Sequence, residues 1–207
     1  MDTLALFGTI LGLGFTAGIN LYATVLVTGL GLRLGWIHAP PALVGLDVLT
    51  HPVILTFAGL LYVVEFVADK VPAVDHAWDL VHTFIRPGCA AWIAWAAIGD
   101  AGTDPLIDVL VVMLAGGVAL SSHVAKASTR LGASVTGGHA LGAGVALSLT
   151  EDVFAAVIAP AAFAWPRTTA IGVALALLAI LIAVPFFIQR LWRAAQQSWA
   201  WIRGGVS

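Results

Sequence analysis

The sequence predicts an all-helical protein that crosses a lipid bilayer several times. Of its 207 residues, 60% are hydrophobic and only 10% are charged, whereas a soluble domain carries about a quarter charged residues. Apolar stretches of about 20 residues, the length that crosses the hydrocarbon core of a bilayer, recur along the chain. The 22 glycines fit the same class, because small residues let membrane helices pack closely. We therefore expect a polytopic membrane protein with about six transmembrane segments, some of them broken or re-entrant.

The first apolar segment, Leu4–Leu32, is too long for a simple span. As one helix of about 29 residues it would measure roughly 43 Å, against a hydrocarbon core of about 30 Å. It holds several glycines, followed by Asn20. A single tilted helix fits these residues, and so does a re-entrant helix broken around Gly14–Asn20. Because backbone freed by a break must be surrounded by protein or by a water-filled cavity, the break is a candidate site.

Five further segments are apolar and long enough to cross: Pro52–Ala68, Leu80–Ile98, Pro105–Val124, Ala140–Pro160 and Ala170–Ile188. Leu80–Ile98 contains Arg86-Pro87-Gly88. A proline inside a helix removes a hydrogen bond and clashes with the preceding turn, so we expect this segment to be broken. Interpreting the first or the third segment differently gives five or seven crossings in place of six.

The basic residues give these segments an orientation. With both termini in the cytoplasm, seven of the nine Lys and Arg residues fall inside, and only Arg33 and Arg167 fall outside, as the positive-inside rule expects. Residues 1–189 then form one transmembrane domain. Residues 190–207, where arginines alternate with tryptophans, form an amphipathic cytoplasmic tail at the inner interface. We expect a multi-pass protein of the bacterial inner membrane.

Two pairs of carboxylates lie within or at the ends of apolar segments, where an ionisable group costs about 2.5–3.5 kcal/mol and usually faces a cavity or a partner. Glu65 and Asp69 are four residues apart and share a helical face, whereas Glu151 and Asp152 are adjacent. Desolvated carboxylates near each other tend to share a proton, which suits a proton carrier. The structural alternative is that Asp69 marks a helix end, that Glu65 is paired, and that Lys126 or Arg130 pairs with one of Glu151 and Asp152.

A polar run, residues 121–126, lies at the inner end of the fourth segment. His123 titrates near neutral pH, although a lone histidine at an interface is more often structural. Lys126, or Arg130 one turn further on, is the natural partner for the acidic pair at 151–152. The residues that we expect to line a substrate or ion pathway are Asn20, Tyr22, Glu65, Asp69, His123, Lys126, Glu151 and Asp152.

A second polar stretch places Asp75, Asp79 and His82 on one helical face. Carboxylates and an imidazole arranged in this way could bind a divalent metal ion. The alternative, which we favour, is a solvated helix next to the membrane with Arg86 as an internal counter-ion. No serine–histidine, zinc-protease or phosphate-loop motif accompanies these residues. A metal-dependent enzyme acting on a lipid is therefore the weaker hypothesis, and no cofactor is otherwise expected.

The two halves of the chain, 1–100 and 101–189, share a weak order of features. Each has a polar stretch, then Arg-Leu-Gly at 33–35 or 130–132, and then an acidic apolar segment. In the expected topology Arg33 lies outside and Arg130 inside, so the halves would be inverted. Inverted repeats with broken helices are the architecture of many secondary transporters.

Composition also excludes some classes. A net charge of −2 gives no case for a nucleic-acid partner. The single cysteine, Cys89, cannot form a disulfide within the chain. The glycine-rich helix faces leave a homo-oligomer open without setting its order.

Several strings of the sequence resemble a known family of bacterial membrane proteins. They are Gly14–Thr24, Glu65–Pro72, Trp78-Asp79, Ser122–Lys126 and Ser148–Asp152. These strings are similar to those of the family named domain of unknown function 4126, and the resemblance covers nearly the whole chain. It implies a compact multi-helix membrane fold and brings no established activity or catalytic residues.

The chemistry of the candidate residues therefore carries the functional prediction. We expect a small transporter or channel in which an ion or solute passes a polar pocket, with carboxylates favouring a cation or a proton. The alternatives are the metal-dependent lipid enzyme and a non-catalytic membrane assembly partner whose buried acids pair with basic residues for folding alone.

Overall fold

The computed structural model describes residues 3–69, 71–99, 104–135 and 141–204, and every regular element in these ranges is helical. The elements are α1 (Thr3–Ile19), α2 (Leu21–Arg33), the 3-10 helix η1 (Pro41–Thr50), α3 (Pro52–Ala68), α4 (Pro72–Ile98), α5 (Pro105–Val135), α6 (Leu141–Ala164) and α7 (Pro166–Gly204). The prediction of an all-helical chain is confirmed.

Three helices contain a stretch long and apolar enough to cross a membrane: Pro105–Gly132, Val145–Ala164 and Pro166–Arg190. A fourth candidate is the pair of η1 and α3, which are bent by 66° at the break between them. This supports a membrane protein with three or four candidate spans among the described residues. It does not confirm the predicted six, in part because the first segment is divided into two helices of 17 and 13 residues.

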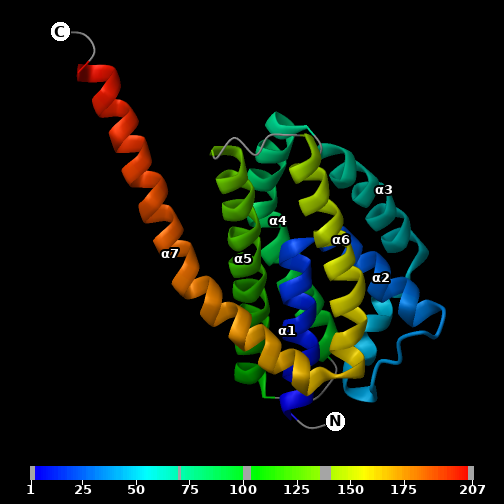
Figure 1. Ribbon diagram of the computed structural model, residues 1–207. Helices are drawn as coiled ribbons and strands as arrows, with labels where there is room; N and C mark the ends of the chain where they lie inside the picture. Colours follow the sequence, from blue (N-terminus) through cyan, green and yellow to red (C-terminus); the bar gives the residue numbers. More distant parts are fainter. Residues whose placement is uncertain (1–2, 70, 100–103, 136–140, 205–207) are drawn as a thin grey trace.

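Helix α1 lies in the middle of the bundle and packs against α4, α5, α6 and α7 (Figure 1). Its glycines make this packing close, because a Cβ atom at Gly18 would overlap the carbonyl oxygen of Ala119 on α5. At the end of α1 the chain turns, and α2 runs back toward the end of the bundle where α1 begins (Figure 1). The first segment is thus a pair of half-helices, as one of its two interpretations predicted.

The expected break in the third segment is wrong. Helix α4 runs without interruption from Pro72 to Ile98, with Pro87 inside it. The energetic cost of an internal proline is offset by tertiary contacts, because Arg86 is fully buried and hydrogen-bonds to the backbone of α1. The short helix η1 was not predicted either. Its Leu43, Leu46 and Leu49 are buried, so it belongs to the core.

The inverted repeat is not confirmed. Helix α5 is continuous through the polar run at 121–126, whereas the corresponding stretch of the first half is the break between α1 and α2. The acidic helices α3 and α6 do run in opposite directions along the bundle (Figure 1).

The core has an apolar part and a polar part. An apolar cluster joins the beginning of α1 and α5, the end of α4 and η1. The polar part lies toward the other end of these helices, around the end of α1. Helix α7 begins beside α1 and then leaves the bundle (Figure 1). It includes the start of the predicted tail, 190–207, part of which lies outside the described residues.

Candidate functional site

The break between α1 and α2 is formed by Asn20. Its backbone is extended (φ −144°, ψ 99°), and its side-chain oxygen accepts a hydrogen bond from the backbone N–H of Ala23 at 2.9 Å. Asparagine is among the strongest residues at this N-cap position, so it starts α2 as α1 ends. Its side-chain amide donates to Asp152 on α6 at 2.7 Å. Asn20 therefore both ends one half-helix and binds a carboxylate.

The carbonyl groups at the end of α1 are satisfied by a buried arginine. Arg86 donates from Nη1 to the carbonyl oxygens of Gly18 and Ile19 at 2.8 and 2.9 Å, and from Nη2 to Glu65 of α3. Arg86 and Glu65 are both 0% exposed. The other oxygen of the Glu65 carboxylate, Oε2, is buried and has no hydrogen-bond partner within the described part of the chain. The end of a helix carries partial negative charge, which favours cations there.

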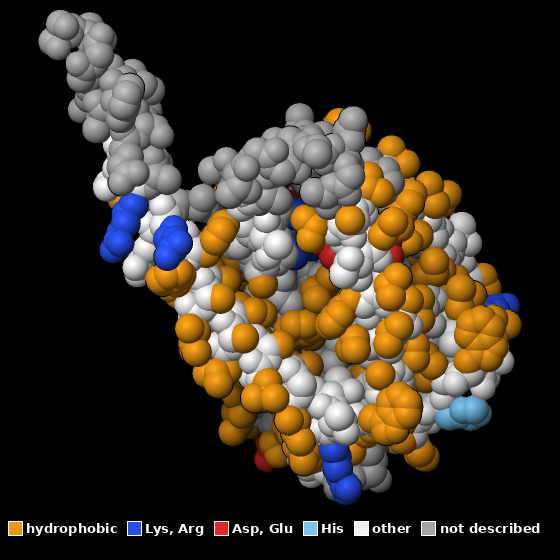
Figure 2. All heavy atoms as spheres, in the orientation of Figure 1, with side chains coloured by type: hydrophobic (Ala, Val, Ile, Leu, Met, Phe, Trp, Pro, Cys, Tyr) orange, Lys and Arg blue, Asp and Glu red, His pale blue; other side chains and the backbone are white. Residues whose placement is uncertain are grey.

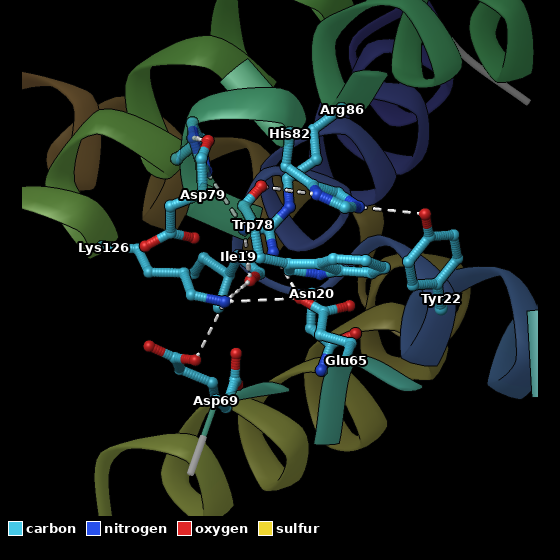
Figure 3. Close-up of polar contacts among 12 residues, drawn as sticks. Ile19, Asn20, Tyr22, Glu65, Asp69, Trp78, Asp79, His82, Arg86 and Lys126 are labelled. Carbon is cyan, nitrogen blue, oxygen red and sulfur yellow. Dashed lines mark hydrogen bonds and ion pairs between the residues drawn. The ribbon is translucent and has the colours of Figure 1, made fainter. Parts of the chain in front are cut away.

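Lys126 of α5 lies at the same helix end, with its ammonium near Ile19 and Glu65 (Figure 3). Its ammonium donates to the carbonyl oxygen of Ile19 at 3.0 Å, lies 3.1 Å from Glu151 and lies 3.5 Å from Glu65. The side chain is only 2% exposed. A carbonyl oxygen and two carboxylates thus surround one buried cation.

Arg130, one turn further along α5, joins the acidic residues of α3 and α6. Its guanidinium lies 2.8 Å from Asp69 and 2.5 Å from Glu151, and Nε donates to Glu151 at 3.2 Å. Ser148 donates to the same oxygen of Asp69 at 3.1 Å. The structural alternative, in which Lys126 or Arg130 pairs with the acidic pair at 151–152, is therefore confirmed for Glu151.

His123 is held in one tautomer by its neighbours. Its Nδ1 lies 3.0 Å from Nη1 of Arg86, and Nε2 lies 3.0 Å from the carbonyl oxygen of Asp79. Because the carbonyl oxygen of Asp79 can only accept, the hydrogen of the neutral ring sits on Nε2, and Nδ1 shares the two Nη1 hydrogens of Arg86 with the carbonyl oxygens of Gly18 and Ile19. The hydroxyl of Thr83 lies 3.1 Å from Nε2. His123 thus links α4 and α5 as a neutral ring.

Tyr22 and His82 form a branch beside the acidic residues. The Tyr22 hydroxyl lies 2.9 Å from Nε2 of His82, whose Nδ1 lies 2.8 Å from the carbonyl oxygen of Trp78 (Figure 3). Since a carbonyl only accepts, Nδ1 carries the hydrogen, and in the neutral ring Nε2 accepts from Tyr22. Both ring nitrogens of His82 are therefore already engaged.

The predicted metal site gains no support among the described residues. No group of three His, Cys, Asp or Glu side chains lies close enough there to hold a metal ion. Asp79 is buried and one of its carboxylate oxygens, Oδ1, has no hydrogen-bond partner in this part of the chain. The side chain of Asp75 lies outside the described residues, so the triad stays a prediction.

All eight predicted pathway residues come together in or beside this buried group, which we call the polar network. Its charged members are the acids Glu65, Asp69, Asp79, Glu151 and Asp152 and the bases Arg86, Lys126 and Arg130. Arg86, Arg130, Ser148 and Thr83 were not among the predicted pathway residues. For Arg86 and Arg130, the sequence signal that could have identified them is their position inside or next to apolar segments, where a charge needs a partner.

A family model describes most of this chain. It matches residues 7–185 and carries the description domain of unknown function, DUF4126. The chain belongs to the DUF4126 family. The resemblance of the sequence strings is thereby confirmed, and the matched range includes every residue of the polar network of this DUF4126 protein. A search of curated proteins and a search of solved structures each found no match.

Proposed function

We propose that this DUF4126 protein is a small membrane transporter that moves a proton or a small cation through its polar network. The observation that carries the proposal is the position of Lys126. Its ammonium is held by the carbonyl oxygen at the end of a broken helix and by two carboxylates from different helices. Broken helices whose ends coordinate ions are the usual binding sites of secondary transporters.

The charge balance supports a cationic substrate. Five carboxylates and three basic side chains make up the described network, an excess of two acids. Buried carboxylates without full compensation take up protons or bind cations. Glu65 Oε2 and Asp69 Oδ1 are buried oxygens without hydrogen-bond partners in the described chain, so each could accept a contact from a cation. A cation that displaces the Lys126 ammonium would be bound by the same carbonyl oxygen and the same two carboxylates.

The division of the core supports a transporter in preference to an open channel. The polar network ends at the end of α1, and beyond it the apolar cluster of α1, α4, α5 and η1 is buried. The described residues of that cluster offer no charged partner to a cation, so we infer that passage requires the helices to rearrange. We further propose the bacterial inner membrane as the location, with about six membrane segments counting the α1–α2 pair. Because the acidic helices α3 and α6 run in opposite directions, we also propose that the two halves of the chain are inverted repeats.

The test is flux in proteoliposomes. A pH-sensitive dye inside the vesicles reports proton movement, and radioactive Na⁺ reports cation movement, under an imposed membrane potential. We expect Glu65→Gln and Glu151→Gln to lower the flux about tenfold or more, because each removes a carboxylate from the path. Asp47→Asn is the matched control, since Asp47 is an exposed carboxylate on η1. Undiminished flux in both buried variants would falsify the proposal.

The ion pairs also favour a second candidate, a membrane assembly partner in which the polar network serves folding alone. A double variant separates the two. Lys126→Gln with Glu151→Gln removes one charge of each sign and so limits the cost of an unpaired buried charge. We expect the double variant to fold and to lose flux. If it folds and transports like the parent, the network is structural and transport takes another route.

A further inference from the structure

A groove lies between α5 and α7 on the outer surface of the bundle. It has a volume of about 610 Å³. Its lining residues are Ala125, Ser128, Thr129 and Gly132 of α5 and Ala179, Ile180, Ala183, Val184, Phe186 and Phe187 of α7. At one end the two helices touch, because a Cβ atom on Gly132 would overlap the ring of Phe187. From there α7 leaves the bundle, so the groove lies where the two helices begin to separate (Figure 1).

The groove opens onto the exposed apolar side of α7. Only 6% of the apolar stretch of α7 is buried inside the protein, so the remainder is available to lipid tails. The α7 wall is wholly apolar, and α5 adds only the small polar side chains of Ser128 and Thr129. Thr129 already donates its hydroxyl to the carbonyl oxygen of Ala125 at 2.9 Å, as a threonine in a lipid environment does. This surface suits a hydrocarbon chain.

Positive charge marks the rim of the groove. The guanidinium carbon of Arg190 lies 4.8 Å from the ring centre of Phe186, which lines the groove. Stacking of this kind occupies the face of the guanidinium and leaves its N–H edge free to donate. Arg193 follows three residues later on the same helical side, and both arginines are exposed. Figure 2 shows basic side chains on α7 next to a hydrophobic face, at the point where the helix leaves the bundle.

We propose that this groove binds one anionic phospholipid, with an acyl chain between α5 and α7 and the phosphate held by Arg190 and Arg193. Arginine donates two parallel hydrogen bonds to a phosphate, and the arginines lie beyond the apolar wall as a headgroup lies beyond its tail. In the expected orientation they face the cytoplasmic leaflet, which carries the anionic lipids of the membrane. A second copy of the chain fits less well, because a two-fold contact along α7 would bring identical arginines together.

The test is native mass spectrometry of the full chain released from nanodiscs of equal parts phosphatidylglycerol and phosphatidylcholine. We expect the parent protein to retain phosphatidylglycerol about tenfold over phosphatidylcholine, because two charges act on the headgroup. Arg190→Gln with Arg193→Gln should abolish this preference. Arg33→Gln is the matched control, since Arg33 is also exposed but lies at the end of α2, away from the groove. Both α7 substitutions are at exposed positions, so they leave the fold intact.

A second variant tests the groove itself. Ala183→Trp places a large side chain in the groove and should reduce the number of bound lipids of either class. Equal retention of the two lipids by the parent, or a preference that survives the double arginine substitution, overturns the proposal. So does a dimer in the parent spectrum that Ala183→Trp converts to a monomer, because the occupant would then be a second copy. None of these readouts requires transport activity.

Discussion

Lys126 joins the two acidic sides of the polar network, since its ammonium contacts Glu65 of α3 and Glu151 of α6. Each carboxylate also has an arginine, Arg86 for Glu65 and Arg130 for Glu151. Removal of the lysine therefore leaves Glu65 and Glu151 each with an arginine partner. At the residue scale this makes Lys126 the side chain that a transported cation could replace without unfolding the site.

Removing one member of the Lys126–Glu151 pair should cost stability that removing both restores in part. We expect Lys126→Gln and Glu151→Gln each to lower the free energy of unfolding by about 3 kcal/mol, the lower end of the range for breaking a buried pair. The double variant should be more stable than the sum of the two losses predicts, by about 0.5–3 kcal/mol. The measurement is unfolding in detergent micelles followed by circular dichroism.

If the loss of unfolding free energy in the double variant equals the sum of the two single losses, Lys126 and Glu151 do not interact. Lys126→Arg serves as the control that keeps the charge. If it retains stability while Lys126→Gln loses it, charge and not side-chain length accounts for the effect.

At the scale of the helices, α1 approaches α5 so closely that Gly18 leaves no room for a side chain. A Cβ atom there would overlap both Ser122 Oγ and the carbonyl oxygen of Ala119. The same stretch of α1 presents the carbonyl groups of Gly18 and Ile19 to Arg86. Gly18 therefore takes part both in the close packing of α1 against α5 and in the contacts of Arg86 at the candidate site.

Gly18→Ala should therefore impair both stability and function. We expect a loss of about 1–3 kcal/mol from overpacking, with a shift of α1 away from α5 that lengthens the contacts of Arg86. Gly117→Ala is the matched control, because a Cβ atom on Gly117 of α5 meets nothing within 4 Å. Thermal unfolding and flux should both fall for Gly18→Ala and stay at the parent value for Gly117→Ala. Equal behaviour of the two variants would rule out close approach as the reason for this glycine.

Some elements could be predicted from the sequence and others could not. Helix α3 has the predicted bounds, Pro52–Ala68, because a proline starts it and charged residues follow it. The break at Asn20 was one of two interpretations, and local residues favoured neither. The continuity of α4 past Pro87 depends on a contact with α1, which is far away in the chain. Local preference for a break was overruled by packing that a single sequence does not show.

The candidate site was predicted better for its acids than for its bases. A carboxylate inside an apolar segment stands out, so Glu65 and Glu151 were identified. Arg86 was assigned to a solvated helix as an internal counter-ion, yet it is 0% exposed. Its contacts come from α1 and α3, which only the folded structure places beside α4. Which charges meet is a property of the tertiary fold, because members of the pairs are up to 61 residues apart.

At the scale of the whole molecule, the directions of the helices bear on the side of the membrane at which each end lies. Helices α1 and α7 begin at the same end of the bundle, and α7 ends at the other (Figure 1). We expect the α1–α2 pair to turn back without crossing the membrane and α3 to α7 to make the passes through it. Arg33 and Arg167 then lie at one end, whereas Lys126, Arg130, Arg190 and Arg193 lie toward the other. This arrangement keeps the charge asymmetry and predicts that the start of the chain lies outside, whereas the sequence analysis expects both termini in the cytoplasm.

Cysteine labelling decides between the two arrangements. In a chain with Cys89→Ser, single cysteines are introduced as Thr3→Cys, Trp36→Cys or Gln196→Cys, all at exposed positions, and intact spheroplasts are treated with a membrane-impermeant maleimide. We expect labelling at 3 and 36 in intact spheroplasts, and labelling at 196 only after the membrane is opened. Position 36 lies outside in both arrangements and is the control. Protection of position 3 together with 196 would show that α1 and α2 cross the membrane as one segment, and the half-helix pair could not then be re-entrant.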